Sequence, residues 1–155
     1  VIEVSPLFSD FTFKGRSVAS VFRFIAQWDQ YVQLAKEAGV DKAFPVSTLQ
    51  GLRLLYTDRL ILIRQIKTLR NLVREGNKMN HCVATYAGEC IGGQTSIWSM
   101  RQISATGKMK HLLTIEIETA SHKVIEVRGK NNRLPKKREE EWLAAWVVQN
   151  KEMCY

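Results

Sequence analysis

The spacing of the hydrophobic residues changes twice along this chain. From Ser17 to about residue 92, apolar residues recur at intervals of three and four, which places them on one face of an α-helix. From residue 95 to residue 130 they alternate with polar residues, as in half-buried β-strands, and helical spacing returns after residue 137. The pattern therefore predicts an α+β protein, with helices packed on a small antiparallel sheet.

Helices are predicted for most of the first half of the chain. Residues 1–16 fit an extended entry segment with one short strand at most. A helix then begins with Ser17 as its N-cap and ends at Gly39. The dense apolar pattern of residues 49–73 predicts one long helix or two adjoining helices.

The stretch "GNKMNHCVATY", residues 76–86, predicts a further helix. Four residues at i, i+3, i+4 and i+7 form its apolar stripe: Met79, Cys82, Val83 and Tyr86. Asn77, His81 and Thr85 follow another face. His81 and Cys82 are therefore neighbours in sequence that point in different directions, and their adjacency alone does not predict a catalytic dyad.

Three runs in the second half alternate with period two: "TSIWSMRQI" (95–103), "HLLTIEIET" (111–119) and "KVIEVRGK" (123–130). Short connectors between them predict an antiparallel meander. The tail has a helical apolar face, made of Trp142, Leu143, Ala145, Trp146 and Val147. The predicted architecture is a set of N-terminal helices packed on a small three-stranded meander, with a C-terminal helix.

The 155 residues fit a single domain, 1–155. We expect a mainly helical part at 1–75, followed by a part at 76–155 with the motif-bearing helix, the sheet and the C-terminal helix. The chain begins with Val1 rather than Met, as a fragment of a longer protein would. Its hydrophobic fraction of 45% and the lack of a long apolar run predict a cytoplasmic protein without a membrane segment.

Cysteine and histidine usage predicts neither a disulfide framework nor a metal site. The three cysteines are Cys82, Cys90 and Cys154, an odd number without a CxxC pair. His111 and His122 each stand apart from other potential ligands. No cofactor is predicted.

The net charge of +8 favours nucleic acid or another acidic partner. A cationic segment, "EVRGKNNRLPKKR", follows the third strand. Arg128, Lys130, Asn131 and Asn132 are candidate anion ligands in its turn. The cations after the turn form a candidate nucleic-acid patch: Arg133, Lys136, Lys137 and Arg138. The alternative is a solvated turn whose charges keep the sheet edge from pairing.

Two sequence blocks together resemble a known family. "GNKMNHCVATY", a strand containing "TIEI", and "VIEVRGKNNRLP" occur in the order found in the PcfJ-like family. The resembling positions are Gly76, Met79, His81, Cys82, Val83, Tyr86, Thr114, Glu116, Arg128, Gly129, Lys130, Asn131 and Asn132. The resemblance covers roughly residues 70–148 and implies a protein of conjugative plasmids, phages or related mobile elements. It implies no established biochemical activity.

Three kinds of chemistry remain open at this point. His81 with Cys82 could act as a thiol enzyme, although a Cys on the apolar stripe is more typical of a buried structural residue. Glu116, Glu118 and Glu126 with Lys130 resemble the acidic residues and lysine of metal-dependent nucleases, the one alternative that involves a divalent metal. Finally, His81, Glu116 and the Arg128 turn could converge into one anion-binding pocket.

We expect a nucleic-acid-associated or nucleotide-binding accessory domain of a mobile genetic element. An enzyme of the phosphodiesterase, nuclease or Cys/His-dependent type, with a site around His81, Cys82, Glu116 and Arg128, is the first alternative. A protein–protein adaptor is the second. The expected partners are nucleic acid or a nucleotide, and a protein from the same mobile element.

Overall fold

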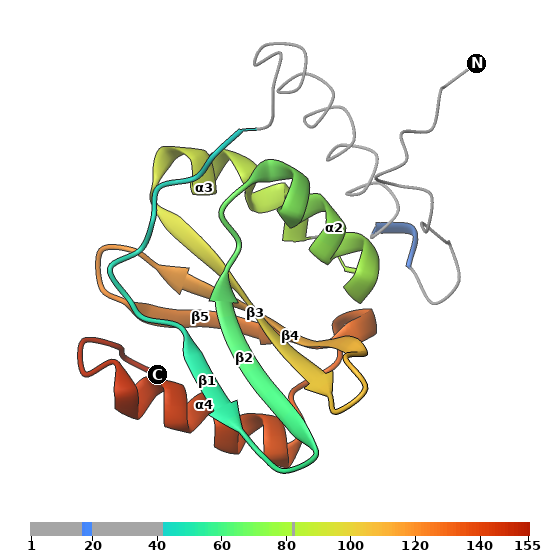
Figure 1. The fold of residues 1–155 in the computed structure, drawn as a ribbon. Helices are drawn as coiled ribbons and strands as arrows, with labels where there is room; N and C mark the ends of the chain where they lie inside the picture. The colour runs from blue at the N-terminus through green and yellow to red at the C-terminus, as the bar shows by residue number, and fades with distance from the viewer. Residues whose placement is uncertain (1–16, 20–41, 82) are drawn as a thin grey trace.

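The computed structural model describes residues 17–19, 42–81 and 83–155 (Figure 1). Its central element is a five-stranded antiparallel sheet with the strand order β1-β2-β3-β4-β5. The strands are β1 (Leu52–Leu55), β2 (Arg59–Gln65), β3 (Thr95–Ser104), β4 (Met109–Glu118) and β5 (Lys123–Arg128). Each strand therefore pairs with the strand that precedes it in sequence.

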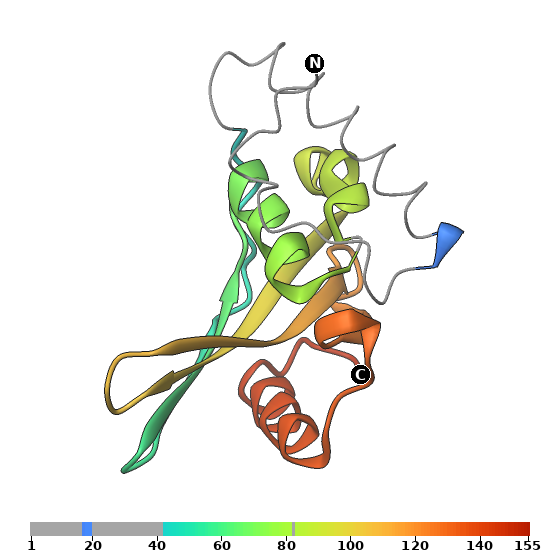
Figure 2. The same cartoon turned by 90° about the vertical axis from the view of Figure 1, so that its right-hand side faces the viewer.

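Helices cover both faces of the sheet (Figure 2). Three elements lie between β2 and β3 in sequence and pack on one face: α2 (Leu69–Met79), the 3-10 helix η2 (Val83–Tyr86) and α3 (Ala87–Gly92). A short 3-10 helix, η3 (Lys130–Asn132), follows β5, and α4 (Lys137–Gln149) lies along the opposite face. No helix among the described residues is long and apolar enough to cross a membrane.

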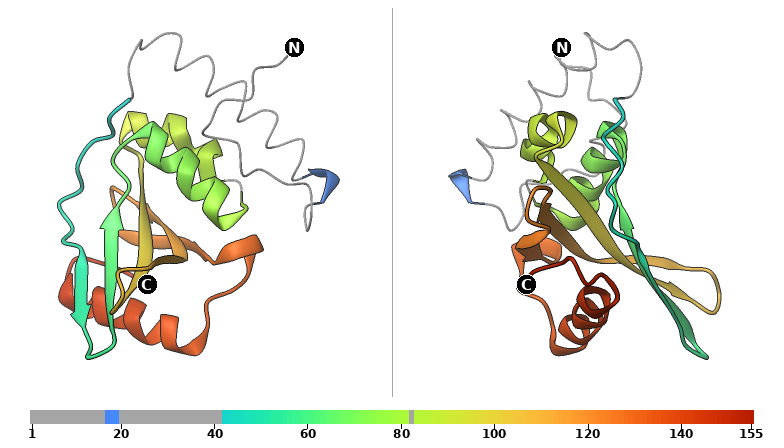
Figure 3. Two further views of the ribbon diagram at one scale, coloured as in Figure 1. Left: turned by 45° about the vertical axis from the view of Figure 1, so that its right-hand side comes forward. Right: turned by 90° about the vertical axis from the view of Figure 1, so that its left-hand side faces the viewer.

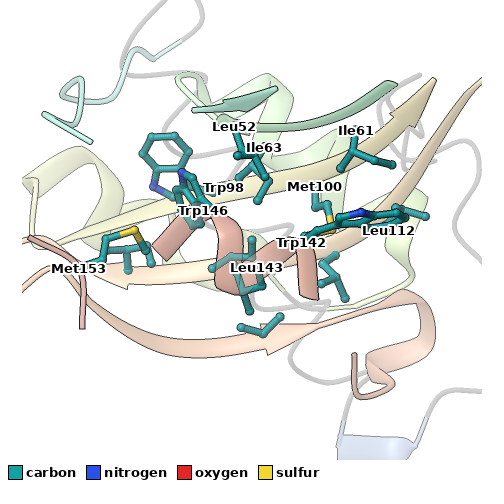
Figure 4. Packing of buried hydrophobic residues seen from close by; sticks show 14 of the residues in the cluster. Leu52, Ile61, Ile63, Trp98, Met100, Leu112, Trp142, Leu143, Trp146 and Met153 are labelled. Atoms are coloured by element: carbon teal, nitrogen blue, oxygen red, sulfur yellow. The ribbon is translucent and has the colours of Figure 1, made fainter. Parts of the chain in front are cut away.

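The larger hydrophobic core lies between the sheet and α4 (Figure 4). The rings of Trp98 and Trp146 are tilted against each other, with centroids 4.9 Å apart. Trp146 Nε1 also donates a hydrogen bond of 2.7 Å to the carbonyl oxygen of Gln50. The α4 helix is thereby fixed to the segment that leads into β1.

A smaller core lies on the other face, between the sheet and α2, η2 and α3. Its buried residues are Phe44, Ile66, Leu69, Leu72, Val73, Val83, Ala87, Cys90 and Ile97. The Thr68 hydroxyl caps α2 by accepting a hydrogen bond from Asn71 N at 3.2 Å. The candidate site lies on this face, because Glu116, Arg128 and His81 are on the same side of the sheet.

The separation into a sheet and helices fits the expected α+β class, but the expected architecture is wrong. The sheet has five strands rather than three. The segment 49–73, expected to be helical throughout, forms β1 and β2, and only its last residues belong to a helix, α2. In β2, Ile61 and Ile63 face the main core, while Leu60 and Leu62 are half-buried on the other face. A strand with apolar residues on both faces has no alternation, so its pattern resembles that of a buried helix.

The helix expected over residues 76–86 is also interrupted. The α2 helix ends at Met79, and Asn80 takes a left-handed conformation, with φ 51° and ψ 48°. His81 N then donates to Gly76 O at 3.1 Å, which closes the helix end. The continuous helix expected across Met79 and Val83 is therefore broken. Cys82, the helix expected from Ser17 to Gly39 beyond residues 17–19, and the entry segment 1–16 lie outside the described residues.

The remaining elements agree with the sequence pattern. The three alternating runs form β3, β4 and β5, and the tail forms α4. Of the predicted apolar face of α4, Trp142, Leu143 and Trp146 are buried, while Ala145 is exposed. The division at residue 75 and the single-domain organisation stay predictions.

Candidate functional site

Glu75 is the centre of a buried polar network between α2 and the sheet. Its side chain is fully buried, and its carboxylate accepts three hydrogen bonds. His111 Nδ1 lies 2.6 Å from Oε2, Ser99 Oγ donates to Oε2 at 3.1 Å, and Thr114 Oγ1 donates to Oε1 at 2.7 Å. Arg101 Nε extends the network by donating to Ser99 Oγ at 3.1 Å. A buried carboxylate with this many donors is fixed in one orientation.

The network reaches His81 through Thr114. His81 Nε2 lies 2.8 Å from Thr114 Oγ1. Thr114 has one hydroxyl hydrogen, which it donates to Glu75, so it must accept its second bond from His81. The Nε2 atom of His81 therefore carries a hydrogen, and Glu75 sets both the tautomer and the orientation of the ring through Thr114.

The turn after α2 brings His81 back onto the sheet. An added Cβ at Gly76 would lie 3.2 Å from the carbonyl oxygen of His81 and 3.6 Å from Val83 Cγ1. Gly76 therefore allows the chain that leaves the helix to pass close to its last turn. The left-handed Asn80 supplies the reversal, and its side-chain Nδ2 donates to Asn131 Oδ1 at 2.6 Å.

Arg128 lies beside this corner. Thr114 and Arg128 are directly paired across β4 and β5, so their side chains share one face of the sheet. Arg128 Nη2 forms an ion pair of 3.1 Å with Glu126 Oε1, and its side chain is 34% exposed. The sequence-predicted His81, Arg128 and Asn131 are thus brought to one region, at the end of α2 and the start of η3. Lys130 and Asn132 lie in the same short helix and are exposed.

Glu116 is a buried carboxyl group on the same face. It is directly paired with Glu126 across the strands and is 9% exposed. Burial, followed by the charges of Glu126 and Glu89, raises the pKa of Glu116. Burial, followed by the charges of Glu116, Glu126 and Glu89, raises the pKa of the Tyr86 hydroxyl.

Two cations of the candidate nucleic-acid patch, Arg133 and Arg138, also make contacts within the protein. Arg133 makes two hydrogen bonds with Glu139, of 2.8 and 2.7 Å, and a third, of 3.2 Å, with Leu112 O. Burial opposes ionisation of Glu139, but its bonds with Arg133 and Lys136 N outweigh burial and lower its pKa. The guanidinium of Arg138 lies over the rings of Tyr56 and Trp142.

Arg133 and Arg138 therefore help to hold the connection into α4. The other two cations of the patch, Lys136 and Lys137, are exposed at the start of that helix.

The described residues offer little support for a thiol enzyme or for a metal-dependent nuclease. Cys90 is buried, and burial raises the pKa of its thiol to about 12, so it is a poor nucleophile. Cys82 lies outside the described residues, and its role stays a prediction. Among residues 17–19, 42–81 and 83–155, no group of three or more His, Cys, Asp or Glu side chains could hold a metal ion.

Sequence reasoning missed Glu75, Thr114 and Ser99 as members of the network. The signal for Glu75 was its spacing, because Leu72, Glu75 and Met79 stand at i, i+3 and i+7 of an amphipathic helix. A charged residue on an apolar stripe indicates a buried polar contact. Nothing in the sequence indicated which strand residues would meet it.

A family model described as PcfJ-like protein matches residues 23–143. The match spans most of the chain and includes Glu75, His81, Glu116 and Arg128. No curated protein and no solved structure matches the sequence.

Proposed function

We propose, from the premise that this chain belongs to the PcfJ-like protein family, that it binds the phosphate groups of nucleic acid at the corner formed by α2, β4, β5 and η3. The observation that carries the proposal is the pairing of Arg128 with Thr114, the residue that orients His81. A guanidinium that is 34% exposed then lies on the same face as the residue that orients the imidazole, and it can donate hydrogen bonds to a phosphate oxygen.

The charges around this corner support an anionic ligand. Lys78 is exposed in the last turn of α2, and Lys130 is exposed in η3. The chain as a whole carries a net charge of +8, which would attract a polyanion over a longer range. We further propose that the protein acts in the cytoplasm as an accessory factor of a mobile genetic element.

Arg128→Gln should weaken binding of a fluorescently labelled single-stranded oligonucleotide at least tenfold. Loss of one phosphate contact should also reduce the slope of log affinity against log salt by up to about one unit. Arg59→Gln is the matched control, because Arg59 is 36% exposed and is also paired with one carboxylate, that of Asp58. Fluorescence anisotropy at several salt concentrations measures both effects.

Equal losses for the two arginine variants would show that only the net charge matters and would contradict the proposed corner. A mononucleotide and an oligonucleotide should be compared in the same titration. Similar affinities for both would identify a nucleotide-binding site, whereas a strong preference for the oligonucleotide supports binding along a nucleic-acid backbone.

A second candidate function, acid–base cleavage of a phosphodiester, is favoured by Glu116. A buried carboxyl group with a raised pKa beside a second carboxylate is a frequent arrangement in acid–base sites. In this scheme, Glu116 accepts the proton of the attacking hydroxyl group, and protonated His81 gives a proton to the leaving oxygen. The P–O bond to the nucleophile forms as the bond to the leaving oxygen breaks.

Glu116→Gln separates this candidate from simple binding. Because the folded protein holds the proton of Glu116 more tightly than the unfolded chain, ionisation of Glu116 destabilises the fold as the pH rises through its pKa. The variant should therefore melt at a higher temperature than the unchanged protein at pH 7, and the difference should disappear in acid. If Glu116 is catalytic, cleavage of a labelled RNA should fall at least 100-fold while binding remains.

An unchanged cleavage rate in Glu116→Gln, or no cleavage by the unchanged protein, would remove this candidate and leave the binding proposal intact.

A further inference from the structure

The sheet extends beyond α2 at the tips of the β1–β2 and β3–β4 hairpins. Figures 2 and 3 show the β1–β2 and β3–β4 tips reaching past α2, while α4 lies along the opposite face. On the α2 side of these tips, four apolar residues stand in register across four strands: Leu55, Leu60, Ile103 and Met109. We call these four residues the apolar row.

The apolar row is open to solvent, in contrast to the core on the other face. Leu55 is 77% exposed and Met109 is 49% exposed, while Leu60 and Ile103 are half-buried. Ile61, which points to the other face from β2, is fully buried against α4. Aligned apolar residues on four adjacent strands are a continuous patch rather than scattered surface residues.

Basic residues flank the apolar row on the side nearer to α2. The next residues in register across the same strands are Arg53, Leu62, Arg101 and His111. Arg64 is exposed on the same face of β2. None of the strand residues in register with the apolar row or with these basic residues is acidic. Glu116 lies farther along β4 on the same face, and Asp58 in the β1–β2 turn is already paired with Arg59. Glu75 of α2 is buried in its own network.

We propose that the apolar row and its arginines dock an acidic amphipathic helix of a partner protein, laid across the four strands. Neighbouring strands are separated by about 4.8 Å. One turn of an α-helix rises about 5.4 Å, so a helix with an apolar residue at each turn nearly matches the repeat of the row. Acidic residues beside its apolar stripe would face Arg53 and Arg101.

The composition of the surface disfavours two other ligands, nucleic acid and a second copy of the chain. Nucleic acid that lies on an open sheet usually stacks its bases on aromatic side chains, and the row is entirely aliphatic. A second copy of the chain would bring another net charge of +8 against the same arginines. An acidic helix satisfies both the apolar and the cationic parts of the surface.

The test uses a synthetic helical peptide with a leucine at each turn and glutamates beside the leucines. Its fluorescence anisotropy should report binding to the unchanged protein and at least a tenfold weaker affinity for Leu55→Glu. Val148→Glu is the matched control, because Val148 is 78% exposed on α4, on the opposite side of the sheet. Both positions are exposed, so both variants should fold, as circular dichroism can verify.

A peptide with the same composition but scrambled leucines should bind more weakly than the designed peptide. Equal affinity of Leu55→Glu and Val148→Glu for the designed peptide would overturn the proposal. So would self-association of the unchanged protein that Leu55→Glu abolishes, or oligonucleotide binding that Leu55→Glu abolishes. The Arg128→Gln experiment does not involve this surface, so the two proposals can fail independently.

Discussion

Glu75→Ala should lower the free energy of unfolding by about 3–5 kcal/mol, as expected when one partner of a buried charged network is removed. The change leaves His111, Ser99 and Thr114 without the carboxylate that accepts their hydrogen bonds. It also leaves a cavity between α2 and the sheet, because the side chain is fully buried. Urea denaturation followed by far-ultraviolet circular dichroism measures the effect.

Two variants show whether the network or the packing is responsible. Glu75→Gln keeps the shape but loses the charge, and we expect it to cost about 1.5–3 kcal/mol, the range for a hydrogen bond to a charged group. Glu152→Ala changes an exposed carboxylate and should stay within about 0.5 kcal/mol of the unchanged protein. If Glu75→Gln were as stable as the unchanged protein, the charge of Glu75 would not be needed for folding.

Glu75→Gln should also weaken phosphate binding, because the orientation of His81 depends on the bond from Thr114 to Glu75. Normal oligonucleotide affinity in a folded Glu75→Gln variant would separate the buried network from the proposed function.

Trp146→Ala should lower the free energy of unfolding by about 3–5 kcal/mol, the usual range for loss of a buried aromatic side chain. Trp146 is fully buried, packs on Trp98 and donates a hydrogen bond to Gln50 O. The measurement is the midpoint of chemical denaturation at constant slope, which reports a change in stability rather than in the denatured state.

Trp146→Phe should retain part of this stability, because the ring still fills much of the space but cannot donate to Gln50. Val148→Ala, at an exposed position of the same helix, should change stability little. A loss below about 1 kcal/mol for Trp146→Ala would mean that α4 contributes little to the main core.

The strands of the second half were predictable because each has one face in the main core. In β4, Leu113, Ile115 and Ile117 face α4, while Thr114 and Glu116 face the other side. This alternation is visible in the sequence. The β2 strand was missed because Leu60 and Leu62 are apolar on the face that α2 leaves open. The same apolar residues that made β2 resemble a helix in the sequence lie on the surface that we propose as a docking site.

The candidate site was predictable only in its exposed and motif-bearing members. The sequence blocks pointed to His81, Arg128 and Asn131, and the fold brings these residues to one corner. The role of the cationic run after β5 stays a prediction, and the sequence did not indicate that Arg133 would be held by Glu139. Partners of this kind depend on tertiary packing, which a charge pattern does not contain.

The position of α4 in the sequence has a consequence for synthesis on the ribosome. All five strands leave the ribosome before the helix that covers their hydrophobic face. Until α4 emerges, residues such as Ile61, Trp98 and Leu113 lack their packing partners, and the nascent sheet exposes hydrophobic surface to solvent. Contacts between Gln50 and Asn150, 100 residues apart, can form only afterwards. Slow translation of the α4 codons would therefore prolong the interval in which the nascent chain is prone to aggregate or to require a chaperone.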